Sequence, residues 1–251
     1  MVYGDIGTSP LYAIRECIRG EHGVGVSAPA VFGVLSLVFW TIVVVVTLKY
    51  HVYVLRADNK GEGGILALMA LVHGQVKGRA RAVVVALGLF GAALLYADGV
   101  LTPAISVLGA MEGLEVGHAA FAQYIVPLTV IVLIVLFLFQ RHGTAGIGAV
   151  FGPIMVVWFV VLAVLGVHGI LLRPGVLAAV NPVYAVRLFA DHGRAGFLVL
   201  GAVFLVATGG EALYADLGHF HERAIQVDWF CLVAPCLLLN YFGQGALVLG
   251  N

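Results

Sequence analysis

Three carboxylic acids, Asp5, Asp98 and Glu211, lie inside stretches of sequence that are otherwise strongly apolar. A charged carboxylate at the centre of a bilayer costs about 2.5 to 3.5 kcal/mol on insertion scales, so it normally faces a cavity, a partner group or an ion. Each acid also has a structural interpretation: Asp5 as a helix cap, Asp98 as part of a buried hydrogen bond, and Glu211 as a link between one half-helix and its neighbour. These acids are the first candidates for a functional site.

Hydroxyl oxygens follow one of these acids at helical spacing. Thr102 and Ser106 come four and eight residues after Asp98, so a helix presents all three on one face. Pro103 cannot donate a backbone hydrogen bond and releases the carbonyl of Gly99 beside them. A site made of oxygen ligands, without cysteine or neutral histidine ligands at metal spacing, suits a hard cation rather than zinc or copper.

Two apolar segments contain residues that interrupt a helix. Residues 3–13 read YGDIGTSPLYA and combine two glycines with Pro10. Residues 208–216 read TGGEALYAD, and both segments run from a glycine into Leu-Tyr-Ala at the same offset, over residues 7–13 and 209–215. Paired interruptions in two halves of a chain are typical of secondary transporters built from inverted repeats, with the binding site between the broken helices.

More hydroxyl groups lie beside the two interruptions. Ser9 and Tyr12 would point the same way as Asp5 if the first segment stays nearly helical, and Thr208 begins the second interrupted stretch. Serine and threonine hydroxyls also bond to their own helix backbone, and tyrosine also serves as a packing or interface residue. Both interpretations of these side chains therefore stay open at this point.

The composition excludes several classes of protein. Of 251 residues 62% are hydrophobic, and 13 Lys and Arg balance 13 Asp and Glu, whereas a soluble domain carries roughly 25% charged residues. The formal net charge of zero leaves no cationic surface for nucleic acid. The three cysteines imply no disulfide framework. The sequence contains neither a His-Glu-x-x-His zinc motif nor a nucleophile elbow, so we expect neither an enzyme nor a cofactor.

Apolar stretches long enough to cross a bilayer predict an all-α polytopic membrane protein with about seven spans, forming one integral membrane domain over residues 1–251. The first span, at residues 2–14, is expected to be partial, because it is apolar from its start and resembles no signal peptide. Six further spans are expected at about residues 31–55, 83–111, 121–139, 146–170, 195–220 and 229–250.

The connection at residues 56–81 holds the densest group of lysines and arginines in the chain. Short cationic loops stay in the cytoplasm, so this loop is predicted to be cytoplasmic. Within it, residues 59–64 are expected to form a turn, and residues 65–73 a short amphipathic helix at the membrane interface.

Five strings of residues, in order along the chain, resemble the KUP/HAK/KT potassium transporter family. They are YGDIGTSPLY at residues 3–12, NKGEGG at 59–64, YADGVLTPAIS at 96–106, QRHGT at 140–144 and TGGEALYAD at 208–216. The resemblance covers nearly the whole chain. It implies potassium uptake by symport with protons, on the broken-helix, inverted-repeat fold (LeuT/APC-like) shared with amino-acid transporters. Family members have more spans and a cytoplasmic C-terminal region, so the chain is expected to be an N-terminal fragment.

The resemblance also implies which residues bind the ions. The family's potassium site would be formed here by Asp5, Tyr12, Asp98, Thr102, Ser106 and Thr208. Glu211 matches the family's intramembrane glutamate and is the candidate for proton coupling. A dehydrated potassium ion would lie between the two broken helices and the third span, with protein oxygens replacing its water. The implied partners are potassium, protons and lipid, with a homodimer as a candidate assembly, in the plasma membrane, most simply a bacterial inner membrane.

Two alternatives use other substrates or mechanisms. A proton-coupled amino-acid transporter on the same fold would bind a substrate carboxylate with free N–H groups at the first break, which the acid at Asp5 disfavours. An ion channel would require a continuous filter and repeated pore loops, and the sequence shows two broken helices instead.

Overall fold

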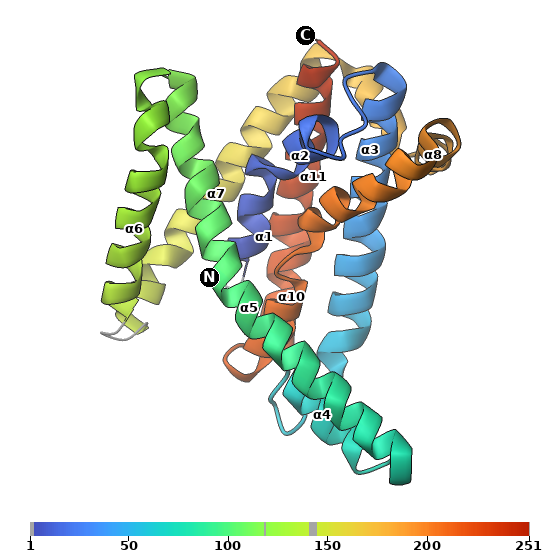
Figure 1. Ribbon diagram of the computed structural model, residues 1–251, viewed down its shortest axis with the longest axis vertical. Coiled ribbons are helices and arrows are strands. Elements are labelled where there is room, and N and C mark those ends of the chain that lie inside the picture. Colours follow the sequence, from blue (N-terminus) through green and yellow to red (C-terminus); the bar gives the residue numbers. More distant parts are fainter. Residues whose placement is uncertain (1–2, 118, 141–144, 251) are drawn as a thin grey trace. The chain divides into compact units, whose positions relative to one another are not determined.

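The computed structural model describes residues 3–117, 119–140 and 145–250 (Figure 1). Over these ranges the chain is helical, and its one β-type pairing is an isolated bridge between Asn59 and Glu62. Apart from Gln140, the QRHGT string lies outside the described residues. The described chain is all-α, as the long apolar runs of the sequence predict.

Six helices in the described residues are long and apolar enough to cross a membrane. They are Ala28–Arg56, Gly78–Glu115, Ala120–Leu138, Phe151–Leu172, Val183–Gly218 and Glu222–Val248. Each overlaps one of the six full spans expected from the sequence. The fifth differs most, because it begins at Val183 rather than near residue 195; Gly193, with φ of 48° and ψ of −115°, breaks its regular geometry close to the expected start. The protein is therefore a multi-pass membrane protein.

The packing of the chain divides it into two compact units. Ile65–Met155 forms the first, here called the hairpin unit, and Val2–Gly64 with Val156–Asn251 forms the second, here called the bundle unit. Helix α7 (Ala145–Leu172) begins in the hairpin unit and ends in the bundle unit, and Pro153 lies just before the boundary.

In the hairpin unit, the long helix α5 (Gly78–Gly117) packs against α4 (Ile65–His73) and against α6 (Ile125–Gln140). Gly88 allows α4 to approach closely, because a Cβ placed there would lie 2.5 Å from the sulfur of Met69. The short helix expected at residues 65–73 is confirmed as α4, with the same bounds.

The turn expected at residues 59–64 is also confirmed, and it belongs to the bundle unit. Lys60 and Gly61 adopt positive φ angles of 57° and 87°, which reverse the chain direction. Gly63 packs against the carbonyl oxygen of Tyr214, which a Cβ at this position would approach to 2.1 Å. The turn therefore touches the segment that contains the second predicted interruption.

The bundle unit is organised around α3 (Ala28–Thr41), which continues into the π-helical segment η2 (Ile42–Tyr53). α3 packs against α8 (Val183–Phe204) and α11 (Ala234–Val248) (Figure 1). The fully buried side chains of this unit include Leu35, Ile42, Leu188, Leu237 and Tyr241. These side chains belong to the apolar core of the bundle unit.

Helices α7 and α11 cross within the bundle unit at almost direct backbone contact. A Cβ on Gly243 would lie 2.4 Å from the carbonyl oxygen of Gly166, and a Cβ on Gly169 would lie 2.5 Å from that of Gly243. One turn away, Asn240 Nδ2 donates to the carbonyl of Leu162 at 2.9 Å. Small residues and a buried amide are the means by which helices associate in lipid, where burial of apolar surface supplies little driving force.

Candidate functional site

The first predicted interruption is present in the structure. Helix α1 (Gly4–Thr8) passes into the 3-10 segment η1 (Ser9–Leu11), and Tyr12 leaves helical geometry with a φ of −131° before α2 (Ala13–Arg19) begins. Pro10 lies inside η1, where it removes the N–H that a continuous α-helix requires. The first segment is therefore a broken helix, and its carboxylate and hydroxyl residues lie at the break or just before it.

The second predicted interruption separates α8 from α9 (Gly210–Ala215). The 3-10 turn η6 (Leu205–Ala207) follows α8, Thr208 is extended with ψ of 146°, and Gly209 has a φ of 85°. A residue with a Cβ is disfavoured at this φ, so glycine is the residue that permits the break.

The repeated Leu-Tyr-Ala string does not place the two breaks at equivalent positions. In the first segment the break falls at residues 9–12, inside the repeated string. In the second it falls at residues 205–209, and the repeated letters lie in α9. The reason is that proline causes the first break and a left-handed glycine causes the second.

The two breaks are in direct contact. Ser9 Oγ donates to the carbonyl of Leu205 at 2.9 Å, and Thr208 Oγ1 donates to the same carbonyl at 2.7 Å. These two hydroxyl oxygens lie 3.3 Å apart, and Tyr12 Oη lies 3.5 Å from Ser9 Oγ. The structure thus brings together Tyr12 and Thr208, two predicted site residues, through the fully buried Ser9. The sequence grouped Ser9 with Asp5 and Tyr12 by position, although Ser9 is not among the residues that the family resemblance implies for the potassium site.

Asp5 belongs to the same group of residues. Its carboxylate packs against Gly209, since a Cβ built there would lie 2.9 Å from Asp5 Oδ2. The N-cap position of α1 is Tyr3, so Asp5 does not cap that helix, and Thr8 Oγ1 donates to the backbone carbonyl of Asp5 at 2.9 Å. The oxygen-rich group at the two breaks, here called the break cluster, consists of Asp5, Ser9, Tyr12 and Thr208. One carboxylate with three hydroxyls is a ligand set for a hard cation.

The carbonyl groups at the breaks are held by side chains from neighbouring helices. Trp158 Nε1 of α7 donates to the carbonyl of Gly7 at 2.8 Å, and Gln244 Nε2 of α11 donates to the carbonyl of Pro10 at 2.8 Å. A carbonyl oxygen has two lone pairs, so each can accept one more bond or coordinate a cation. α7 and α11 therefore fix the shape of the first break.

Glu211, the candidate for proton coupling, lies in the first turn of α9. Tyr50 Oη of η2 donates to Glu211 Oε2 at 3.1 Å, and the ring of Tyr50 lies against Gly210. This contact is the link between a half-helix and its neighbour that the sequence left open as an interpretation. A carboxylate that accepts one hydroxyl bond can still bind a proton, so the coupling role stays a prediction.

Asp98, Thr102 and Ser106 lie on α5, in the hairpin unit, and all three are half-buried. Thr102 Oγ1 donates to Asp98 Oδ1 at 2.9 Å, as their spacing of four residues allows. The predicted oxygen face is therefore present on a continuous helix that contains Pro103. These three residues belong to the hairpin unit and the break cluster belongs to the bundle unit, so their combination into one potassium site stays a prediction.

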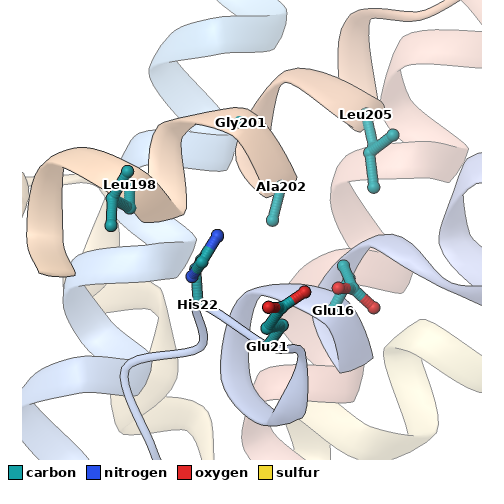
Figure 2. Close-up of a pocket in the computed structure, with 7 residues that line it drawn as sticks. All are labelled: Glu16, Glu21, His22, Leu198, Gly201, Ala202 and Leu205. Carbon is teal, nitrogen blue, oxygen red and sulfur yellow. The ribbon is translucent and has the colours of Figure 1, made fainter.

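A pocket lies next to the second break, between α8 on one side and α2 with the chain that follows it on the other (Figure 2). Glu16, Glu21 and His22 form one wall, and the small residues Gly201 and Ala202 form part of the other. Leu205, whose carbonyl accepts hydrogen bonds from the Ser9 and Thr208 hydroxyls, also lines this pocket. Figure 2 shows the two carboxylates on the side opposite α8.

Comparison with known families decides what these features belong to. All of residues 1–251 match the model of the K+ potassium transporter integral membrane domain. The chain belongs to the K+ potassium transporter family. This membership confirms the resemblance carried by the five sequence strings.

Curated relatives of the potassium transporter family are similar along the whole chain. The chain is 61% identical to the probable potassium transport system protein Kup 1 of Geobacter sulfurreducens, covering 100% of the chain and 40% of that protein. It is 62% identical to a probable potassium transport system protein Kup of Anaeromyxobacter dehalogenans, and the match covers 99% of the chain and 37% of that protein. It is 57% identical to the probable potassium transport system protein Kup of Myxococcus xanthus, and the match covers 99% of the chain and 39% of that protein. No solved structure matches the chain.

The chain spans about 40% of the length of the curated relatives that it matches. The K+ potassium transporter family is a family of transporters rather than enzymes. The match gives no support to the amino-acid transporter alternative, because the similar proteins are named for potassium transport.

Proposed function

We propose that the protein takes up potassium into the cell by symport with protons. The observation that carries the proposal is the contact of two broken helices at an oxygen-rich cluster, in a chain that belongs to a potassium transporter family. Hydroxyls and a carboxylate placed where two helices are unwound can replace the hydration shell of an alkali cation. The proposal needs no cofactor besides the transported ions.

The proposed cation site has two parts. Asp5, Tyr12 and Thr208 bind from the breaks, with Ser9 holding the two breaks together. Asp98, Thr102 and Ser106 bind from α5, where the bond from Thr102 orients the Asp98 carboxylate. Two carboxylates in an apolar environment supply the negative charge that a dehydrated cation requires, and the cation in turn offsets the cost of burying them.

Glu211 is the proposed proton carrier. It lies two residues after Gly209, in the first turn of α9, and its bond to Tyr50 connects α9 to η2. Protonation removes the charge of the acceptor and weakens this charge-assisted hydrogen bond. Binding of a proton can therefore change how α9 is held beside the break. The setting proposed for this exchange is a bacterial inner membrane, and a homodimer is the candidate assembly.

The test of the site and of the substrate is rubidium uptake by the full-length protein in potassium-starved cells. Replacing Asp98 by Asn removes one formal charge and keeps the shape of the side chain. Because a hydrogen bond or ligand contact to a charged group is worth about 1.5 to 3 kcal/mol, we expect uptake at low rubidium to fall about tenfold or more. Glu115→Gln, on the exposed end of the same helix, is the control.

Uptake that is undiminished in Asp98→Asn would remove Asp98 from the ion site. An uptake signal restricted to amino acids in the wild-type protein would overturn the potassium proposal itself.

Glu211→Gln tests proton coupling. We expect this variant to keep measurable rubidium uptake but to lose its inhibition by a protonophore, because the amide cannot carry a proton across the membrane. Tyr50→Phe is the matched variant, since it removes the bond to Glu211 and keeps the acid. If Glu211 only links α9 to η2, both variants will show the same uptake and the same response to the protonophore.

A further inference from the structure

A second buried polar group lies in the bundle unit, and the proposed potassium site does not use it. His51 and Trp229 are fully buried, and Tyr3 is 6% exposed. The indole of Trp229 stacks on the imidazole of His51 with ring centroids 4.5 Å apart, and the Tyr3 ring packs beside both. These three residues are here called the histidine cluster. An imidazole buried among apolar rings requires a partner for each ring nitrogen.

With a neutral His51, the histidine cluster has one proton fewer than its three hydrogen-bonding contacts require. His51 Nδ1 lies 2.9 Å from the carbonyl of Val46, which can only accept, so Nδ1 carries a proton. His51 Nε2 lies 3.2 Å from the hydroxyl oxygen of Tyr3. That hydroxyl has a single proton and donates it to the carbonyl of Ile225. With a neutral imidazole, Nε2 and the hydroxyl oxygen therefore face each other with lone pairs.

One additional proton on Nε2 resolves this conflict. His51 Nε2 then donates to the Tyr3 oxygen, Tyr3 donates to Ile225, and Nδ1 still donates to Val46. The face of the Trp229 indole adds a second favourable term, because it attracts a cation by about 0.5 to 2 kcal/mol. The added hydrogen bond to Tyr3 and the attraction of the Trp229 indole both offset the cost of burying a charged imidazolium.

Two acids of α10 (Glu222–Asp228) lie next to the histidine cluster. Asp228 is the last residue of α10 and directly precedes Trp229 of the cluster. Glu222 accepts from Gln226, whose amide also donates to the backbone carbonyl of His51 at 2.8 Å. Negative charge on this side of the cluster favours an added proton.

The remaining groups around His51 come from η2, its own segment, and from η8; they are aromatic rings and the ammonium group of Lys49. The titratable groups beside His51 on η2 are Lys49, Tyr50 and Tyr53. Lys49 Nζ stays with the ring of Tyr50, 4.8 Å from its centroid, and Tyr53 is exposed. The segment η8 (Trp229–Val233) contributes the rings of Trp229 and Phe230.

We infer that His51 is a proton-binding site, and that its second proton fastens Tyr3, and with it the start of the first broken helix, to η2, while Tyr3 keeps its bond to α10. Tyr3 immediately precedes α1, which carries Asp5 of the break cluster. Proton binding at His51 therefore adds a bond that holds the N-terminal end of the broken helix in place, and proton release removes that bond. The link to transport rests on the proposed proton symport, whereas proton binding by His51 does not.

The direct test is a pH titration of the purified full-length protein with ¹⁵N-labelled histidine, followed by NMR of the ring nitrogens. We expect the His51 ring, assigned by the signal lost in His51→Gln, to become doubly protonated while the protein stays folded. Tyr3→Phe keeps the ring and removes the acceptor of the new bond, so it should bind the proton about tenfold more weakly. The control is His192→Gln: His192 Nδ1 faces the carbonyl of Leu188, four residues earlier, much as His51 Nδ1 faces that of Val46, five residues earlier, and loss of His192 should not alter the His51 titration.

The inference is overturned if His51 stays neutral at every pH at which the protein is folded, or if Tyr3→Phe leaves its titration unchanged. Rubidium uptake against pH then tests the role in transport, and we expect the pH profile of Tyr3→Phe to shift in the same direction as its ring titration. Proton-coupled uptake with a neutral His51 removes this site and leaves the proposed function intact. A titrating His51 in a protein that takes up no potassium keeps the site and removes the function.

Discussion

Gly243→Leu is expected to prevent the accumulation of correctly folded protein. A Cβ at this position would lie 2.4 Å from the carbonyl oxygen and 2.5 Å from the Cα of Gly166, so α11 would have to move away from α7. The atoms in the way are backbone, which cannot rotate aside as a side chain can. The bond from Asn240 to Leu162 crosses the same interface, and the bond from Gln244 supports the first break.

The expected size of this effect follows from those losses. Overpacking alone costs about 1 to 3 kcal/mol, and each buried amide left without its partner adds about 1 to 3 kcal/mol. Together these terms amount to about 3 to 9 kcal/mol, which is comparable with the lower part of the total stability of about 5 to 15 kcal/mol that proteins typically have. The measurement is the yield of monodisperse full-length protein and its thermal unfolding in detergent.

Gly201→Leu is the matched control, because no atom lies within 4 Å of a Cβ added to Gly201 of α8. Gly201→Leu makes the same substitution in the bundle unit, at a position where no other helix crosses in backbone contact. Equal yield and equal unfolding temperature for the two variants would show that α7 and α11 do not require backbone contact.

Gly209→Ala is expected to abolish most transport while leaving much of the protein folded. The added methyl group meets two obstacles: a φ of 85°, which costs roughly 1 to 2 kcal/mol for a residue with a Cβ, and the Asp5 carboxylate, which would lie 2.9 Å from it. The carboxylate can only escape by moving out of the break cluster. We expect rubidium uptake to fall about tenfold or more, which corresponds to a loss of about 1.4 kcal/mol in binding.

Gly25→Ala separates the two causes. Gly25 has a similar φ of 79°, but a Cβ there would meet nothing within 4 Å. It should therefore show the backbone strain in thermal unfolding and retain uptake. If Gly25→Ala and Gly209→Ala lose the same uptake for the same loss of stability, the contact with Asp5 has no part in transport.

The sequence by itself determined the features that depend on local chemistry. Long apolar runs predicted an all-α membrane protein, because backbone groups in lipid must bond within their own segment. Pro10 predicted the first break, because its ring removes an N–H wherever it lies. The bond between Thr102 and Asp98 follows from a spacing of four residues on a helix. The turn at residues 59–64 was likewise predicted from its glycines, and the helix at residues 65–73 from its hydropathy.

Only the tertiary structure decided which distant groups meet. Ser9 contacts Leu205, which lies 196 positions away, and Tyr50 holds Glu211 across 161 positions. The repeated Leu-Tyr-Ala string suggested equivalent breaks, but the position of each break depends on its own proline or glycine. His51 shows no motif at all in the sequence, and its significance comes from Trp229 and the carbonyls packed around it. A side chain's partner is set by how helices pack, and packing depends on shape at every contact rather than on residue type at one position.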